Sequence, residues 1–98
     1  MKKRLRRKFY YLERIIKGFA NHRRIEILDL LDEKEELSTE DICDALDINY
    51  KTANEHLRRL VIPSLIWKRR EGLVAYYRLS PLGKTILIFL RKLEKEVK

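Results

Sequence analysis

Hydrophobic residues recur at helical spacing over the first third of the chain. Between residues 3 and 19 they stand four, three, four and three positions apart, at Leu5, Phe9, Leu12, Ile16 and Phe19. That spacing places them on one stripe of an α-helix. Asn21 is a suitable N-cap for a second helix, predicted over residues 22–33, whose inward positions are Ile25, Leu28 and Leu31.

Two shorter helices are predicted next, joined by a turn of three residues. Ser38 stands three positions before Asp41, a near relative of the capping box, and begins a helix whose inward residues are Ile42, Ala45 and Leu46. After the turn at residues 47–49, Asn49 caps a further helix whose apolar side carries Ala53, Leu57 and Leu60. The charged segment 34–36 is expected to be a plain connector.

A hairpin and a last helix complete the pattern. Pro63 ends the fourth helix and is expected to move Ile62 out of the helical region. Residues 65–67 and 73–77 are rich in strand formers and flank Arg70-Glu71-Gly72, which predicts a two-stranded hairpin with glycine in its turn. A last helix begins at Pro81, capped by Ser80. We therefore predict one mainly α domain over residues 1–98, a winged helix-turn-helix whose order is helix, helix, helix, turn, helix, hairpin, helix.

The formal net charge of +8 is unevenly distributed along the chain. Residues 1–8 hold six bases and no acid, and residues 49–78 hold seven bases and two acids. Between these two basic blocks, residues 9–48 hold five bases and eleven acids. A merely solubilising surface would mix the signs more evenly. The segregation therefore points to a polyanionic partner.

The candidate contacts with DNA are the polar side chains of the helix after Asn49 and the basic residues of the hairpin. A helix in the major groove needs outward side chains that hydrogen-bond to base edges. The candidates on this helix are Tyr50, Lys51, Thr52, Asn54, Glu55, Arg58 and Arg59. Three basic residues are expected at the hairpin tip, where they contact the phosphate backbone or the minor groove of DNA: Lys68, Arg69 and Arg70. The basic N-terminal arm is either a further phosphate contact or a solubilising helix start.

Five stretches in a fixed order carry a resemblance: IKGFANHRRIEIL at 16–28, ELSTEDICDAL at 36–46, TANEHLRRL at 52–60, RREG at 69–72 and YYRL at 76–79. They resemble the arsenical-repressor (ArsR) family of winged-helix regulators, over residues 15–80. The resemblance implies a homodimer with the first and last helices, 1–19 and 81–98, at the interface and with DNA read by the helix after Asn49. The family usually has glycine before the first wing strand; this chain has Pro63-Ser64, which leaves the tilt of the wing open.

The last helix independently permits that dimer, because apolar residues surround most of its circumference: Leu82, Ile86, Leu87, Ile88, Phe89, Leu90 and Leu93. A helix covered on one side only does not need so many, and a domain of this size has little interior to cover both sides. The competing interpretation is an ordinary core helix. The expected interface comprises Leu5, Phe9, Leu12, Ile16, Ile86, Phe89, Leu90 and Leu93.

No metal site or other cofactor is expected. Metal sensors of the family carry Cys-x-Cys at the start of the third helix, where this chain has Ser38, Thr39 and Glu40. Others place His and Asp ligands on the last helix, which here has neither. The remaining candidates are isolated in sequence: His22, Cys43 and His56. We expect Cys43 to be buried in the third helix and His56 to belong to the packing face of the fourth.

Enzyme motifs are absent from the sequence, which has no glycine-rich phosphate loop, nucleophile elbow or metal-binding His pair. The longest apolar run, residues 86–90, is too short to span a bilayer, and the single cysteine needs no oxidising compartment, so a cytoplasmic protein is expected. No small-molecule ligand is identifiable. The predicted function is a sequence-specific, homodimeric DNA-binding repressor without a metal-sensing site. The alternatives are a winged helix for protein–protein assembly and a nonspecific architectural nucleic-acid binder.

Overall fold

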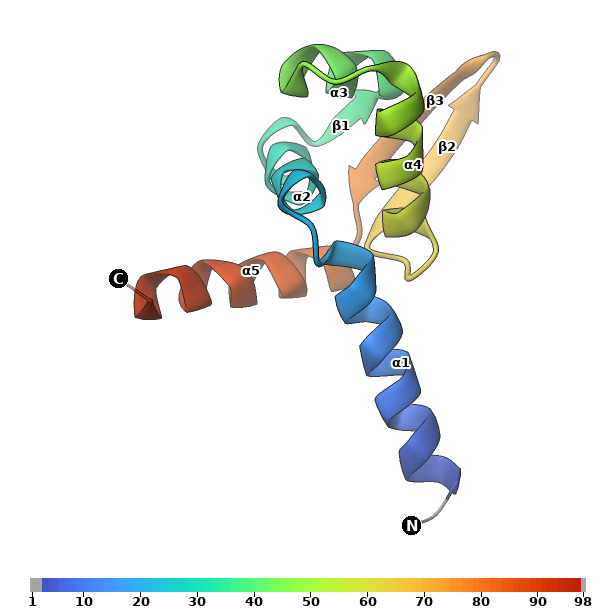
Figure 1. The fold of residues 1–98 in the computed structure, drawn as a ribbon. Helices are drawn as coiled ribbons and strands as arrows, with labels where there is room; N and C mark the ends of the chain where they lie inside the picture. Colours follow the sequence, from blue (N-terminus) through green and yellow to red (C-terminus); the bar gives the residue numbers. More distant parts are fainter. Residues whose placement is uncertain (1–2, 98) are drawn as a thin grey trace.

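The computed structural model describes the backbone of residues 3–97 and the side chains of residues 6–97. Within that range the elements are α1 (Lys3–Phe19), α2 (His22–Lys34), β1 (Glu36–Ser38), α3 (Thr39–Leu46), α4 (Tyr50–Val61), β2 (Ile66–Glu71), β3 (Val74–Leu79) and α5 (Pro81–Glu96) (Figure 1). The predicted order of helices and hairpin is confirmed. α1 and α5 project from one end of the molecule, and the β2–β3 hairpin extends toward the other.

The sheet has a strand that the sequence pattern did not reveal. β1 begins at Glu36, the last residue of the expected connector, and pairs antiparallel with β3, with Glu36 opposite Arg78 and Ser38 opposite Tyr76. The strand order is β1-β3-β2, so β3 is central. A strand of three residues is too short to show an alternating pattern, and its hydrogen-bonding partner lies far along the chain. β1 therefore braces the base of the hairpin without any local signal.

The tip of the hairpin lies further along the chain than expected. Glu71 pairs with Val74, which leaves Gly72 and Leu73 as a two-residue turn. Gly72 has φ of 63°, a left-handed conformation that favours glycine. The expectation that Lys68, Arg69 and Arg70 stand at the tip is therefore wrong, because all three lie within β2. An exposed β-ribbon accepts charged side chains, so β2 continues beyond its run of strand formers.

Local side-chain hydrogen bonds start the helices where the sequence predicted them. Ser38 Oγ accepts from the N–H of Asp41 at 3.1 Å, and Asp41 Oδ2 accepts from the N–H of Ser38 at 3.1 Å, a complete capping box. Asn49 Oδ1 accepts from the N–H of Thr52 at 2.8 Å. These bonds satisfy N–H groups that have no partner inside their helix. They set the directions in which α3 and α4 leave the turn.

The chain reverses after α4 at Ser64. Ile62 remains in the helical region, with φ −53° and ψ −50°, and its N–H donates to Arg58 O at 3.1 Å. The expectation that Pro63 displaces Ile62 from the helix is wrong, because the reversal is absorbed by Ser64 at φ 61°. Gly18 packs against this corner: a Cβ there would lie 2.7 Å from Pro63 Cγ. The end of α1 is thus fitted to the α4–β2 connection.

The core lies between α2, α3, α4 and the inner face of the sheet. Its largest fully buried side chains are Ile27, Leu28, Leu31, Ile42, Leu57, Leu60, Leu65 and Ile66. α3 buries Ile42 and Leu46, four positions apart, whereas Ala45 on the edge of that stripe is exposed, contrary to expectation. Cys43 and Ile25 are half-buried where full burial was expected. This core holds α4 by one side only and leaves its other side free.

Candidate nucleic-acid interface

The outward side of α4 is polar and accessible. Ala53, Leu57 and Leu60 anchor the helix in the core, and Tyr50, Lys51, Thr52 and Glu55 are exposed on the opposite side. Asn54 is half-buried at the border between the two sides. All the predicted contacts on this helix are therefore reachable from solvent. A helix held by one face with hydrogen-bonding groups on the other has the shape needed to enter a DNA groove.

A cleft of about 360 Å³ separates α4 from the hairpin and brings residues of both together. Asn54 and Arg58 line it from α4, and Lys68 and Arg70 line it from β2. Side chains alternate along a strand, so Lys68 and Arg70 share one face of the hairpin, as Tyr77 does on the paired strand. Three cations thus converge on one opening beside an amide that can read a base edge.

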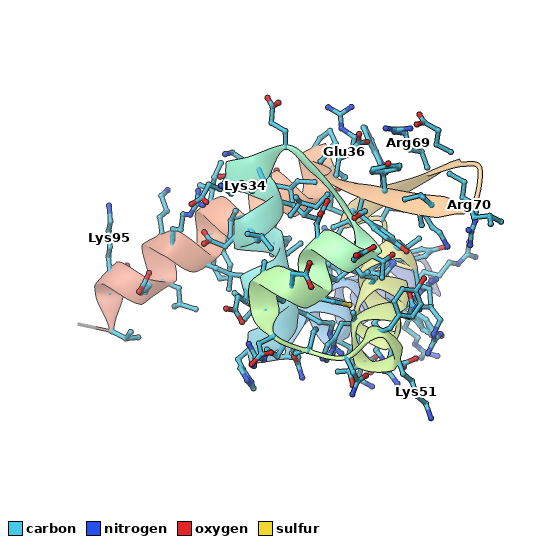
Figure 2. All side chains as sticks on the ribbon, turned by 90° about the horizontal axis from the view of Figure 1, so that it is seen from above. Lys34, Glu36, Lys51, Arg69, Arg70 and Lys95 are labelled. Carbon is cyan, nitrogen blue, oxygen red and sulfur yellow. The ribbon has the colours of Figure 1, made fainter. Side chains whose placement is uncertain are left out.

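Arg69 lies on the other face of the hairpin and is engaged there. Its guanidinium donates to Glu36 on β1 at 2.8 and 2.9 Å and to Glu71 at 3.1 Å, and it lies 4.5 Å from the centroid of the Tyr76 ring. Figure 2 shows Arg69 beside Glu36. Hydrogen bonds from Arg69 lower the pKa of Glu36, and its two carboxylate partners raise the pKa of Arg69. The structure does not bring Arg69 to the cleft with its neighbours in sequence.

Glu55 pairs with two of the predicted DNA contacts. Its carboxylate accepts from Arg58 at 2.8 and 3.2 Å and from Arg59 Nε at 2.9 Å. Hydrogen bonds from both arginines lower the pKa of Glu55 to about 2, so it is ionised at neutral pH. Sequence reasoning missed this arrangement, although spacings of three and four on a helix signal such pairs.

His56 joins α4 to the start of α2. Its Nδ1 lies 3.3 Å from Arg24 Nη1, and both side chains are half-buried. Arg24 is always a donor, so Nδ1 acts as acceptor and the imidazole is neutral. Burial and the charge of Arg24 lower the pKa of His56, and burial lowers the pKa of Arg24. His56 therefore has a packing role, as expected, with a hydrogen-bond partner that the sequence did not indicate.

The faces predicted to form a dimer interface are apolar and accessible. Phe9 on α1 is 62% exposed and Phe89 on α5 is 54% exposed, and Leu12, Ile16 and Leu93 are exposed as well. Ile86 and Leu90 are half-buried, while the side chain of Leu5 lies outside the described residues. Further exposed apolar residues on these two helices, or directly after α5, were not among the predicted set: Tyr10, Tyr11, Ile88 and Val97.

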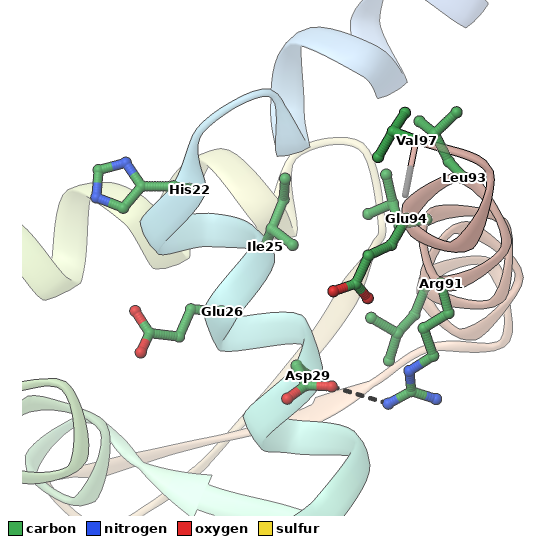
Figure 3. Close-up of a pocket in the computed structure, with 10 residues that line it drawn as sticks. His22, Ile25, Glu26, Asp29, Arg91, Leu93, Glu94 and Val97 are labelled. Carbon is green, nitrogen blue, oxygen red and sulfur yellow. Dashed lines mark hydrogen bonds and ion pairs between the residues drawn. The ribbon is translucent and has the colours of Figure 1, made fainter.

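A groove of about 580 Å³ lies between α2 and α5 (Figure 3). Its apolar lining includes Ile25, Leu90, Leu93 and Val97, and acidic residues Glu26, Asp29 and Glu94 stand along it. Arg91 bridges the two helices, donating to Asp29 at 2.9 Å. The groove is thus an apolar surface with an acidic border, continuous with the exposed face of α5.

Metal-binding groups do not gather in the part of the chain that the structure describes: no three His, Cys, Asp or Glu side chains are placed to share an ion. The half-buried Cys43 has a pKa raised by burial and by the charge of Asp44. Over the same residues, no helix is long and apolar enough to cross a membrane.

Comparison with known proteins identifies the class to which this arrangement belongs. Residues 21–62, from the N-cap of α2 to the C-cap of α4, match the family model for bacterial regulatory proteins of the arsR family. The chain is 42% identical over 67 residues to the HTH-type transcriptional regulator Rv0324 of Mycobacterium tuberculosis, covering 68% of this chain and 29% of that protein. It is 37% identical over 67 residues to the arsenical resistance operon repressor of Escherichia coli, covering 68% and 57%.

A solved structure extends the likeness to almost the whole chain. It is the homodimeric winged helix-turn-helix DNA-binding domain (fragment 1–100) of Mb0332 from Mycobacterium bovis, described as a possible ArsR-family transcriptional regulator. The identity is 32%, with a TM-score of 0.82 over 98% of this chain and 88% of that one. The chain belongs to the ArsR family of winged helix-turn-helix transcription regulators. It spans less than two thirds of the length of either curated relative.

Proposed function

We propose that this protein is a homodimeric repressor that reads a two-fold symmetric DNA site through α4 and senses no metal. The observation that carries the proposal is the cleft between α4 and the hairpin, where Asn54 and Arg58 meet Lys68 and Arg70. Membership of the ArsR family agrees with it. A regulator of this kind acts where the DNA of the cell lies, which we take to be the cytoplasm.

The two walls of the cleft have different tasks. With α4 in the major groove, Asn54 can make a bidentate pair with adenine, and Lys51 or Arg58 can bind guanine or a phosphate. Lys68 and Arg70 face the phosphate backbone that passes between α4 and the hairpin. Phosphate contacts fix the position of the protein on the duplex, whereas base contacts choose the sequence. Thr52 and Tyr50, at the exposed start of α4, complete the contact with the groove.

Dimerisation follows from the apolar faces of α1 and α5. Exposed Phe9, Phe89 and Leu93 would be covered by a second copy, which removes these apolar side chains from water. A two-fold dimer presents two copies of α4 about one turn of DNA apart, roughly 34–36 Å, so the operator would be palindromic. Binding both half-sites together raises the affinity above that of either half-site alone.

The proposed absence of metal sensing rests on the donor groups available. Ser38, Thr39 and Glu40 start the third helix where thiolate ligands would be needed, and Thr39 is buried. Cys43 stands alone on α3 in sequence, and His56 already accepts a hydrogen bond from Arg24. We infer that a metal ion does not control the binding of this protein to DNA.

Selection of binding sites from random duplex DNA, followed by fluorescence anisotropy across a salt series, tests the function. A two-fold symmetric consensus is expected, with log affinity falling against log salt at a slope near −5 for about six phosphate contacts. An added chelator should change neither folding nor affinity. Binding without any consensus would indicate an architectural protein, and no binding at low salt would indicate an assembly module.

A further inference from the structure

The tip of the hairpin is apolar and completely exposed. Leu73 is 99% accessible to solvent, and its neighbour Val74 is also exposed. The turn itself is made by Gly72, whose surroundings are open: a Cβ there would meet nothing within 4 Å. Neither folding nor packing thus requires leucine at this position. Turns normally carry polar residues, so the apolar side chain of Leu73 has no role within the isolated protein.

Leu73 stands on the side of the molecule that faces DNA in the proposed function. It borders the cleft lined by Asn54 and Arg58 of α4 and by Lys68 and Arg70 of β2. With Tyr50, the first residue of α4, it also borders a smaller hollow. The apolar tip therefore extends beyond a set of cations that suits an anionic partner. A protein partner that matched the tip alone would leave Lys68 and Arg70 without an anionic partner.

The hairpin is built to hold its tip in place. β2 and β3 pair over six residues each, from Ile66 opposite Leu79 to Glu71 opposite Val74. β1 supports β3 up to Tyr76, and Arg69 ties β2 to this base through Glu36 and the Tyr76 ring. Only the last two pairs of residues project beyond this support. Leu73 is thus presented on a short, braced arm.

We propose that Leu73 is a wedge that enters the DNA minor groove beside each half-site, partly unstacks one base step and bends the duplex. The inference rests on the proposed DNA-binding function and assigns a separate task to the tip. Minor-groove proteins kink DNA in this way by inserting apolar side chains between base pairs, beside Arg and Lys side chains in the same groove. Pyrimidine–purine steps unstack most easily, so the wedge selects sequence at positions that α4 does not touch.

The test places 2-aminopurine, a base whose fluorescence rises on unstacking, at successive positions flanking the half-sites of the selected duplex. Wild-type protein should raise the fluorescence severalfold at one position in each flank. Leu73→Phe keeps a wedge and should retain the rise, whereas Leu73→Ala and Leu73→Lys should lose it. Because Leu73 packs against nothing, all three variants should keep the wild-type circular dichroism and melting temperature.

Affinity provides the second readout. Leu73→Ala should weaken binding to the intact duplex about tenfold, and much less to a duplex with a mismatch at the wedge position, where the step is already loosened. If wild-type protein binds DNA without unstacking any flanking base, the wedge is wrong. Tighter binding of all duplexes by Leu73→Lys would then show that the tip lies only beside phosphates. If wild-type protein binds no duplex at all, it is the proposed function that fails.

Discussion

Glu55 and Arg58 form a two-pronged ion pair on the outward side of α4, with the carboxylate accepting from Nε at 3.2 Å and from Nη2 at 2.8 Å. Arg59 shares the same carboxylate. One acid thus engages two bases on the helix proposed to read DNA. Such exposed pairs are weak, so a phosphate can displace the carboxylate, but the displacement opposes binding to every DNA sequence alike.

Replacing Glu55 by Gln should therefore tighten binding to random DNA severalfold and steepen the salt slope by about one for each arginine released. Because the displacement opposes all sequences alike, the ratio of specific to random affinity should stay close to that of the wild type. Since the pKa of Glu55 is lowered to about 2, the difference between variant and wild type should not change between pH 5 and pH 8. Glu26→Gln is the control, because Glu26 forms an ion pair with Arg23, three positions away, on α2 and away from α4. An unchanged salt slope for Glu55→Gln would contradict this role.

Replacing Asn54 and replacing the basic residues that face the cleft should affect DNA binding in different ways. Asn54→Ala is expected to cost roughly 1–3 kcal/mol on the selected site and to relax the choice of base there. Lys68→Ala and Arg70→Ala should instead weaken all sequences comparably and reduce the salt slope by about one each. Arg69→Ala, on the opposite face of the same strand, should change the slope least. Anisotropy on selected and random duplexes measures all four, and equal losses for Asn54→Ala on both would rule out base readout.

A charge in either apolar face should dissociate the dimer. Phe9→Glu and Leu93→Glu place a carboxylate without a partner in the proposed interface, where its desolvation is unfavourable. Sedimentation equilibrium should report a shift to monomer, with reduced DNA affinity although every DNA-facing residue is intact. Leu73→Glu is the control, because it adds the same charge at the far end of the molecule and should leave the dimer intact. Wild-type protein that sediments as a monomer at micromolar concentration would refute the interface.

Gly83, near the start of α5, should tolerate no side chain. A Cβ at this buried position would lie 2.1 Å from Leu65 O and 2.7 Å from Leu79 Cδ1. Gly83→Ala forces the backbone of α5 away from the β2 start and should cost about 1–3 kcal/mol or more in unfolding free energy. Gly18→Ala should cost less, because the nearest backbone atom to a Cβ there, Arg59 O, lies at 3.2 Å. Urea denaturation measures the loss of unfolding free energy in both variants, with exposed Lys92→Ala as control. A smaller loss for Gly83→Ala than for Gly18→Ala would show that α5 can shift freely.

Stability should fall in mild acid through His56. Its pKa is lowered from the ordinary value of 6.5, so below that pH the unfolded chain binds the proton more readily than the folded one. The contribution of His56 to the free energy of unfolding is complete above pH 6.5. It declines as the pH falls toward the lowered pKa of His56 in the folded protein. Urea denaturation at pH 7.5 and 5.5 should show this decline in wild type and in His22→Asn, but less of it in His56→Asn. Equal declines in all three proteins would show that another group is responsible.

Local chemistry in the sequence predicted most of the helical framework. Caps such as Ser38 with Asp41, and Asn49 with Thr52, act within three residues, so neighbouring residue types are enough to indicate them. The apolar stripes predicted that α4 is buried through Ala53, Leu57 and Leu60 and that its other side is polar. Those stripes also predicted the apolar surfaces of α1 and α5, which the structure leaves exposed.

Only the tertiary structure decided how distant residues divide the work. Arg69 and Arg70 are adjacent in sequence, yet strand alternation turns one toward Glu36 and the other toward the cleft beside α4. That division depends on the register of β2 with β3 and on the short strand β1, whose partner is some forty residues away. Arg24 and His56 likewise meet only once α2 packs on α4. The sequence determines helices because their hydrogen bonds are local; pairing across a sheet is decided by the packing of the whole chain.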